Sequence, residues 1–458
     1  MCGIVGIFGI PVASKYAYFG LYSLQHRGQE SVGIAVFDGK CIREYKNLGL
    51  VSEVFDEKKL QELPGEIAIG HVRYSTTGSS TYQNVQPFCV KYAKKTIALA
   101  HNGNLVNAYN LRCELEEEGH IFQTTLDSEV IVHLIVKYLR EGLVAAITKT
   151  MKRIRGAYSV LLLCDDVLVA FRDPWGFRPL AFGVLNGGYA LASETCAFDL
   201  LGVEYLRDVA PGEVLVIDEN GPKSYFPFER DPQPLSHCIF EFIYFARPDS
   251  LIYQKNVYTV RKNLGFNLYR ECPLRADFVM PFPDSGTYAA LGYSQASGIP
   301  LEFGVIRNHY IGRTFIQPSE KLRDLSVRMK LNPVREFIRE KEVIVIDDSL
   351  VRGTTSKNRI RSIKLAGAKK IHFLISCPPL RYPCFFGIDF PQAKELIAAK
   401  HSVEEIRKFL DIDTLYYLSL EGLLDSVGDL RDKVCLACFT GNYPMEVDFS
   451  FRKDITEL

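Results

Sequence analysis

A short stretch near residue 350 places two acids and several small hydroxyl residues directly after an apolar run. Residues 343–346 are Val-Ile-Val-Ile, which is typical of a buried parallel strand, and Asp347 and Asp348 follow. The loop after them contains Ser349, Arg352, Gly353, Thr354 and Thr355. Backbone N–H groups before a helix attract phosphate, and a carboxylate pair can hold ribose hydroxyls or hydrated Mg²⁺. The stretch predicts a site for a phosphorylated sugar, with a plain acidic turn as the alternative.

Cys2 is a second candidate for catalysis, because it stands next to the start methionine. Removal of Met1 would place the thiol beside its own α-amine, whose ordinary pKa is about 8. Such an amine can act as the general base of an N-terminal nucleophile. The alternative is a cysteine that is simply part of the core.

Four polar segments in the first half support the nucleophile hypothesis. They contain Arg27, the pair Arg73 and Tyr74, the pair Asn102 and Gly103, and Asp127. Each has an ordinary alternative when taken alone, such as a surface charge, a hairpin turn or a helix cap. Together with Cys2 they resemble the glutaminase domain of class II glutamine amidotransferases over residues 2–230.

This resemblance implies a role for each residue. Cys2 attacks the glutamine amide and forms a thioester, and Asn102 with the Gly103 N–H stabilises the oxyanion. Each oxyanion donor contributes about 3 kcal/mol. Arg73 pairs with the glutamine α-carboxylate and Asp127 with its α-ammonium group, while Tyr74 and Arg27 lie in loops that close over glutamine.

The 343–356 stretch resembles the ribose-phosphate signature of type I phosphoribosyltransferases, which bind phosphoribosyl pyrophosphate (PRPP). The resemblance implies that Asp347 and Asp348 lie near a bound Mg²⁺. It makes Ser285, in a Pro-Asp-Ser-Gly loop, a candidate for both pyrophosphate and Mg²⁺ binding. It also implies that the basic segment 310–331, with Lys330, folds over PRPP; a solvated basic loop is the alternative.

Cys435 and Cys438 form a Cys-x-x-Cys pair, which alone suits zinc, a redox pair, an iron–sulfur cluster or two buried thiols. The surroundings of Cys238 and Cys384 resemble the iron–sulfur branch of the glutamine PRPP amidotransferases. The resemblance implies a 4Fe-4S cluster on Cys238, Cys384, Cys435 and Cys438.

Taken together, the two halves resemble the glutamine PRPP amidotransferase family. Membership would imply that glutamine-derived ammonia is transferred to PRPP, giving 5-phosphoribosylamine, glutamate and pyrophosphate at the first committed step of purine synthesis. It would also imply feedback by purine nucleotides and a homotetramer, or a homodimer. One alternative is another class II amidotransferase, making glucosamine 6-phosphate or asparagine, and a second is a non-catalytic PRPP sensor.

These residues require two kinds of scaffold. Paired apolar segments around Asp165-Asp166, Asn186-Gly187-Gly188 and Asn220-Gly221 predict hairpins. With the predicted helices 126–139 and 143–154, they fit an α+β N-terminal nucleophile sandwich (αββα). Strand–helix alternation after residue 240, including an expected strand over 240–245, predicts an α/β type I phosphoribosyltransferase domain. The expected domains are 2–230, 231–390 and a helical, cluster-binding extension 391–458.

The composition fits a globular protein. Hydrophobic residues make up 47% of 458 residues, and 54 basic side chains balance 54 acidic ones. A net charge of zero provides no long-range electrostatic attraction for nucleic acid or an anionic membrane. No run of 18 apolar residues and no signal peptide is visible, so we expect a cytoplasmic protein with reduced cysteines.

Overall fold

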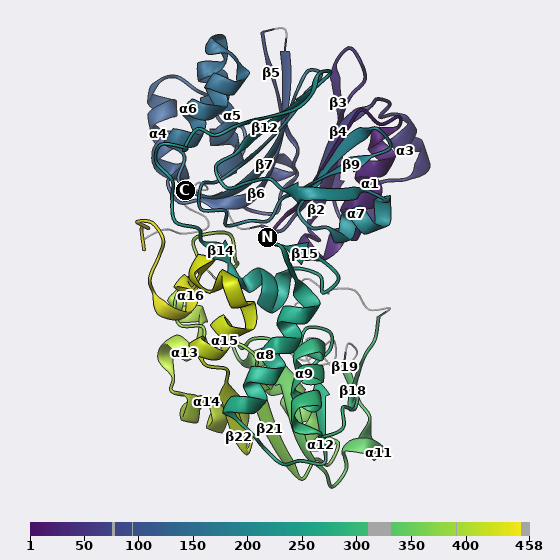
Figure 1. The fold of residues 1–458 in the computed structure, drawn as a ribbon, viewed down its shortest axis with the longest axis vertical. Helices are drawn as coiled ribbons and strands as arrows, with labels where there is room; N and C mark the ends of the chain where they lie inside the picture. The colour runs from purple at the N-terminus through teal and green to yellow at the C-terminus, as the bar shows by residue number, and fades with distance from the viewer. Residues whose placement is uncertain (76–77, 94, 310–330, 391, 450–458) are drawn as a thin grey trace.

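The chain folds into two halves stacked along its long axis (Figure 1). The computed structural model describes residues 1–75, 78–93, 95–309, 331–390 and 392–449. The first half carries two antiparallel sheets and the second a parallel sheet. The N-terminus lies where the halves meet (Figure 1), so the predicted nucleophile is close to both.

The first half is a sandwich of two sheets. One sheet has the order β11 (Glu204–Asp208), β9 (Ala181–Leu185), β10 (Gly188–Ala192), β1 (Gly3–Phe8), β4 (Ile67–Arg73), β2 (Ser31–Phe37) and β3 (Ile42–Leu48). The other has the order β13 (Gly221–Tyr225), β12 (Val214–Asp218), β8 (Val167–Arg172), β7 (Gly156–Cys164), β6 (Lys95–Leu105) and β5 (Phe88–Tyr92). The three predicted hairpins, β7–β8, β9–β10 and β12–β13, are confirmed.

Helices cover both outer faces of this sandwich (Figure 1). The first sheet packs against α1 (Ala13–Ser23), α2 (Val51–Val54), α3 (Glu57–Gln61) and α7 (Cys196–Leu201). The second packs against α4 (Ala108–Glu117), α5 (Asp127–Tyr138) and α6 (Leu143–Arg153). Side chains such as Ile4, Ile69 and Leu161 fill the space between the sheets. The predicted αββα sandwich is therefore confirmed.

The second half is built on one parallel sheet. Its strand order is β17 (Phe278–Pro281), β20 (Glu342–Asp347), β21 (Lys370–Ile375) and β22 (Thr414–Tyr417). Its longer helices are α8 (Val257–Glu271), α9 (Thr287–Ser297), α12 (Thr354–Leu365), α14 (Val403–Leu410) and α15 (Leu420–Val427). Strand β22 belongs to the predicted 391–458 extension and completes this sheet. The boundaries at 230 and 390 stay predictions.

Short elements join the halves and shape the loops. The strands are β14 (His237–Cys238), β15 (Leu251–Ile252), β16 (Lys255–Asn256), β18 (Val305–Arg307), β19 (Leu331–Pro333) and β23 (Val434–Cys435). The short helices are α11 (Arg335–Ile338), α13 (Ile397–Lys400) and α16 (Ala437–Thr440), and the 3-10 turns are η1 (Gln25–Arg27), η2 (Tyr82–Asn84), η3 (Leu139–Glu141), η5 (Ala393–Glu395) and η6 (Gly428–Lys433).

The expected strand over 240–245 is wrong. Residues Glu241–Phe245 form a π-helical turn, η4, and the Glu241 side chain is buried. A short apolar run does not distinguish a strand from a helical turn, so tertiary contacts decided the conformation. In the described part of the chain, no helix is long and apolar enough to cross a membrane.

Candidate active site

Cys2 lies at the start of β1 and is held through its backbone. Its nitrogen donates a hydrogen bond to Asn102 Oδ1 (3.1 Å), and its thiol donates to the Tyr74 carbonyl oxygen (Sγ–O 3.5 Å). Burial raises the pKa of the Cys2 thiol, although the N-terminal charge, the Tyr74 contact and Arg73 oppose that rise. The thiol therefore needs a base to become a nucleophile.

Asn102 and Gly103 lie near the end of β6, next to Cys2. Asn102 is fully buried, and its Nδ2 has no hydrogen-bond partner among the described atoms. Gly103 has φ +159°, and a Cβ there would stand 1.9 Å from the Ala157 carbonyl oxygen. The strand can therefore take only glycine at this position, and it leaves a buried amide donor beside the thiol.

Arg27, which the resemblance implied to lie in a loop that closes over glutamine, contacts the backbone of Cys2. It ends η1 and is fully buried. Its Nε donates to the Cys2 carbonyl oxygen (2.9 Å), and its other nitrogens bind Glu194 and Glu241. Arg27 thus fixes the position of the Cys2 backbone through its carbonyl oxygen.

Arg73 is the last residue of β4, the strand that pairs with β1, and Tyr74 comes directly after it. The buried Arg73 guanidinium donates to the carbonyl oxygens of Ser79 (2.9 Å) and Gly78 (3.0 Å). The half-buried Tyr74 places its hydroxyl 3.5 Å from Asp389 Oδ2 in the second half. Arg73 therefore shapes the loop after β4, and Tyr74 links that loop to the second half.

Asp127 is the first residue of α5 and is buried at the same end of β6. Its Oδ2 accepts a hydrogen bond from the Leu105 N–H (3.0 Å), and its Oδ1 lies 3.6 Å from His101 Nδ1. Burial alone would raise the pKa of Asp127, but the charge of His101 and these hydrogen bonds lower it overall. A buried anion is therefore maintained near Asn102.

Asp347 and Asp348 stand at the carboxyl end of β20, as predicted for a ligand site in a parallel sheet. Both are buried, and Ser285 Oγ lies 3.4 Å from Asp347 Oδ1. Burial, and then the charge of Asp348, raises the pKa of Asp347 well above its usual range, while Arg359 at 3.5 Å only partly opposes this. Two buried carboxyl groups with little compensating positive charge fit a divalent cation, which would favour their ionised forms.

The loop between β20 and α12 has the shape of an anion site. Gly353 precedes α12 with φ +79°, and Thr354 and Thr355 are exposed in the first helical turn. Ser349 Oγ donates to Asp348, and exposed Arg352 pairs with Glu395. The helix N-terminus and the two hydroxyls therefore face solvent, where a phosphate can reach them. Lys330 lies outside the described residues.

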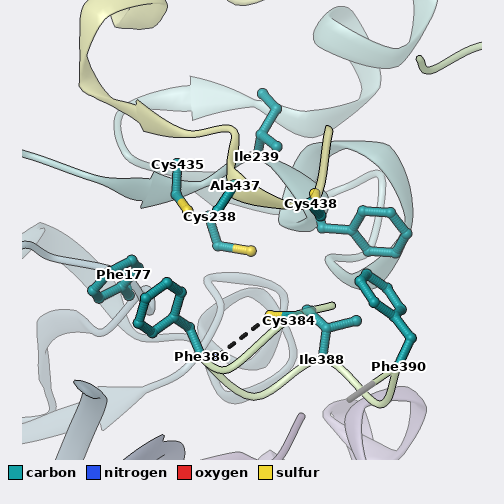
Figure 2. Close-up of a pocket in the computed structure, with 11 residues that line it drawn as sticks. Phe177, Cys238, Ile239, Cys384, Phe386, Ile388, Phe390, Cys435, Ala437 and Cys438 are labelled. Carbon is teal, nitrogen blue, oxygen red and sulfur yellow. Dashed lines mark hydrogen bonds between the residues drawn. The ribbon is translucent and has the colours of Figure 1, made fainter. Parts of the chain in front are cut away.

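The four predicted cluster cysteines line one pocket (Figure 2). Cys238 on β14 pairs in register with Cys435 on β23, Cys438 lies on α16, and Cys384 comes from the loop after β21. The other walls of the pocket include Phe177, Ile239, Phe240 and Phe386. Three segments far apart in sequence thus contribute four cysteine side chains to one apolar pocket.

The protein alone favours the protonated, neutral form of the cysteines in this pocket. Burial raises the pKa of the Cys384, Cys435 and Cys438 thiols, and the neighbouring cysteines raise it further. All twelve cysteines are free thiols. Within the described ranges, no three His, Cys, Asp or Glu side chains already converge as ligands of one metal ion.

The cysteine pocket is joined to the Asn102–Gly103 strand by the segment after Cys384. Asn104 Nδ2 donates to the Phe385 carbonyl oxygen (2.9 Å), and Arg178 donates to that of Phe386. A Cβ on Gly387, which has φ +103°, would stand 3.3 Å from the Gly103 carbonyl carbon. One loop therefore supplies both a pocket cysteine and a wall of the Cys2 site.

Sequence reasoning missed the buried groups that support Cys2. These are Glu194, Glu241, Arg178, Asn104 and Gly387. Asn104 directly follows the predicted site residue Gly103, which was a usable signal. Glu194 and Glu241 lie 167 and 214 residues from Arg27, so no local pattern could have paired them.

Comparison with known proteins gives consistent matches. The family "Glutamine amidotransferase domain" matches residues 71–199. An amidophosphoribosyltransferase of Methanocaldococcus jannaschii is 48% identical over 98% of both chains. That of Bacillus subtilis is 48% identical over 97% of this chain and 94% of its own. The solved structure of the B. subtilis glutamine PRPP amidotransferase complexed with ADP and GMP matches 98% of both chains at 48% identity, with a TM-score of 0.92.

Proposed function

The chain belongs to the amidophosphoribosyltransferase family, and from that membership we propose the roles of its residues and cofactors. It is an enzyme that uses glutamine to aminate PRPP, the first step of purine biosynthesis. The products are 5-phosphoribosylamine, glutamate and pyrophosphate. The first half hydrolyses glutamine and the second half uses the ammonia.

We propose Cys2 as the nucleophile of the first half. After removal of Met1, the nitrogen that lies 3.1 Å from Asn102 Oδ1 becomes the α-amine, which takes the proton from the thiol. The sulfur attacks the glutamine amide carbon, ammonia leaves, and water hydrolyses the thioester to glutamate. Asn102 Nδ2 is the observation that supports this role best, because a buried donor without a partner suits the developing oxyanion.

Glutamine recognition is assigned to Arg73, Tyr74 and Asp127. A buried guanidinium next to the loop after β4 suits the α-carboxylate, and the Asp127 carboxylate, whose pKa is lowered, suits the α-ammonium group. Gly103 supplies a backbone donor for the oxyanion. Arg27 is proposed to position Cys2 through the backbone carbonyl oxygen that it binds.

PRPP binding is assigned to the loop after β20. Asp347 and Asp348 bind the ribose side of PRPP, while Ser349, Arg352, Gly353, Thr354 and Thr355 form the 5-phosphate site at the start of α12. Mg²⁺ would be held near Asp347, Asp348 and Ser285 and would supply positive charge for the departing pyrophosphate. Lys330 is proposed as a further pyrophosphate contact.

The cysteine pocket is proposed as the site of a 4Fe-4S cluster. Two buried and two half-buried cysteines that line one apolar pocket fit this group, whose ligands are cysteine thiolates. The cluster would tie the tail residues Cys435 and Cys438 to Cys238 and Cys384. We also propose a homotetramer and purine nucleotide feedback; the B. subtilis relative was solved with ADP and GMP.

The overall reaction is tested by stoichiometry. The protein, purified without oxygen, should release glutamate and pyrophosphate in equal amounts when glutamine, PRPP and Mg²⁺ are present. Glutamate release should fall strongly when PRPP is omitted. Glutamate without pyrophosphate under all conditions would leave only a glutaminase and refute the coupling.

A further inference from the structure

A buried ion cluster lies directly beneath Cys2. We call it the Arg27 cluster, and it consists of Arg27, Glu194 and Glu241. The side chains of all three are fully buried. Arg27 Nη1 binds Glu194 and Glu241 (3.0 Å), Nη2 binds Glu241 (2.9 Å), and Nε holds the Cys2 carbonyl oxygen (2.9 Å). The guanidinium therefore uses all three of its nitrogens to join two carboxylates to the nucleophile.

The two carboxylates come from different halves of the chain. Glu194 follows β10 in the sandwich, whereas Glu241 belongs to η4, which packs in the core of the second half. Glu194 is itself held from the second half, by the Arg247 N–H (2.8 Å) and the Ser250 hydroxyl (2.7 Å). The position of Arg27 thus depends on how the halves are docked.

The charges in this region compensate one another. Arg178 Nη1 lies 3.5 Å from Glu241 Oε1, so two guanidinium groups face two carboxylates. Burial would raise the pKa of Glu194, but the charge of His26, then that of Arg27, and hydrogen bonds from His26 and Ser250 lower it overall, so Glu194 stays ionised. Removing one charge from such a set leaves an uncompensated buried ion, which forces the remaining groups to move.

We propose that Glu241 is a positioning residue for glutamine hydrolysis: through Arg27 it fixes the Cys2 backbone, so the nucleophile is aligned only when the second half is docked. This rests on the proposed role of Cys2. Without the Glu241 carboxylate, two of the hydrogen bonds that orient the guanidinium are weakened. Arg27 then turns toward Glu194, and its Nε bond to the Cys2 carbonyl is lost.

A merely structural ion pair provides the matched control. Glu213 is as buried as Glu241 and binds Arg207 through two hydrogen bonds (2.7 and 2.8 Å). That pair connects β11 to the turn before β12, and Glu213 accepts its other side-chain hydrogen bonds from the Ala210 N–H and the Ser224 hydroxyl, which lie outside the Arg27 cluster. Glu213→Gln therefore removes a similar interaction without reaching the nucleophile.

The test compares Glu241→Gln with Glu213→Gln in the full chain. Each variant is assayed for glutamine-dependent and ammonia-dependent product formation, and for the rate at which a diazoketone glutamine analogue labels Cys2. Because small misplacements of reacting groups cost about 100-fold, Glu241→Gln should slow both glutamine use and labelling by about that factor. Its ammonia-dependent rate should be retained. Glu213→Gln should keep the parental ratio of the two activities and the parental labelling rate.

Two further variants remove ambiguity. Glu241→Asp keeps the charge and should fold if Glu241→Gln does not; its labelling rate should fall between those of the parent and Glu241→Gln. Normal labelling in a folded Glu241 variant, or equal loss of both activities, overturns the proposal. Cys2→Ala distinguishes a failure of the proposed function from a failure of this inference. If Cys2→Ala keeps its glutamine-dependent activity, the proposed nucleophile is wrong. If Cys2→Ala loses that activity but the Glu241 variants keep it, only the positioning role of Glu241 is refuted.

Discussion

The side chain of Asn102 contacts Cys2 with one end and is unpaired at the other. Its Oδ1 accepts a hydrogen bond from the Cys2 nitrogen at 3.1 Å, while its buried Nδ2 has no partner among the described atoms. A buried donor without a partner costs about 1–3 kcal/mol. Such a cost is expected at a site that is completed by substrate.

Replacing Asn102 with Ala should therefore impair glutamine hydrolysis selectively. Loss of one oxyanion donor lowers kcat by about 100- to 1,000-fold in comparable sites. The glutamine-dependent rate should fall by this factor, and the ammonia-dependent rate should not change. Asn107→Ala, which removes a half-buried amide bonded to Arg153 and Arg155, is the control. Equal effects of the two substitutions would remove Asn102 from the oxyanion site.

A methyl group on Gly387 should damage the glutamine site from the cysteine-pocket side. The added Cβ would stand 3.3 Å from the Gly103 carbonyl carbon and 3.2 Å from Arg178 Nη2. We expect Gly387→Ala to lower the ratio of glutamine-dependent to ammonia-dependent activity. Gly298 also has positive φ but open space around its Cβ position, so Gly298→Ala should cost stability without changing that ratio. An unchanged ratio in Gly387→Ala would show that this contact is not needed.

Asp347→Asn should abolish turnover with both nitrogen sources while making the fold more stable. Burial and Asp348 raise the pKa of Asp347 in the folded protein above its unfolded value. The folded state then holds the proton to higher pH, and the stability that this provides is lost as pH rises through the folded pKa. The gain from Asp347→Asn, measured by urea unfolding, should therefore increase with pH. A destabilised variant with normal PRPP kinetics would contradict both statements.

Cys384→Ser should remove iron from the protein, whereas Cys377→Ser should not. Cys384 lines the pocket with three other cysteines, and Cys377 is a buried thiol outside that lining. Protein purified without oxygen should contain iron and labile sulfide in equal amounts. The serine variant at Cys384 should lose most of both. Stoichiometric zinc, or neither element in the parent, would refute the 4Fe-4S assignment.

Much of this arrangement was predictable because its signals are local. The β20 strand, its two acids and the α12 helix occupy one continuous stretch, and strand–loop–helix geometry dictates the anion site. The hairpins were predictable for the same reason. The residues proposed to bind and hydrolyse glutamine, and the four cysteines, were found through family resemblance, since no periodicity brings together Cys238 and Cys435.

The support of Cys2 was not predictable. Residues 240–245 are mostly apolar, so the π-helical turn that buries Glu241 against Arg27 looks like a strand in the sequence. The pairing spans more than 200 residues and forms only once the halves dock. Buried charges compensate one another through tertiary contacts, and nothing in the flanking residues reports such contacts.

The central claim is that Cys2 makes ammonia for a separate PRPP site in the same chain. The most direct test is Cys2→Ala, assayed in parallel with glutamine and with an ammonium salt as nitrogen source. The account predicts that glutamine-dependent formation of 5-phosphoribosylamine disappears while the ammonia-dependent rate persists. Retention of the glutamine-dependent rate, or loss of both, would contradict it.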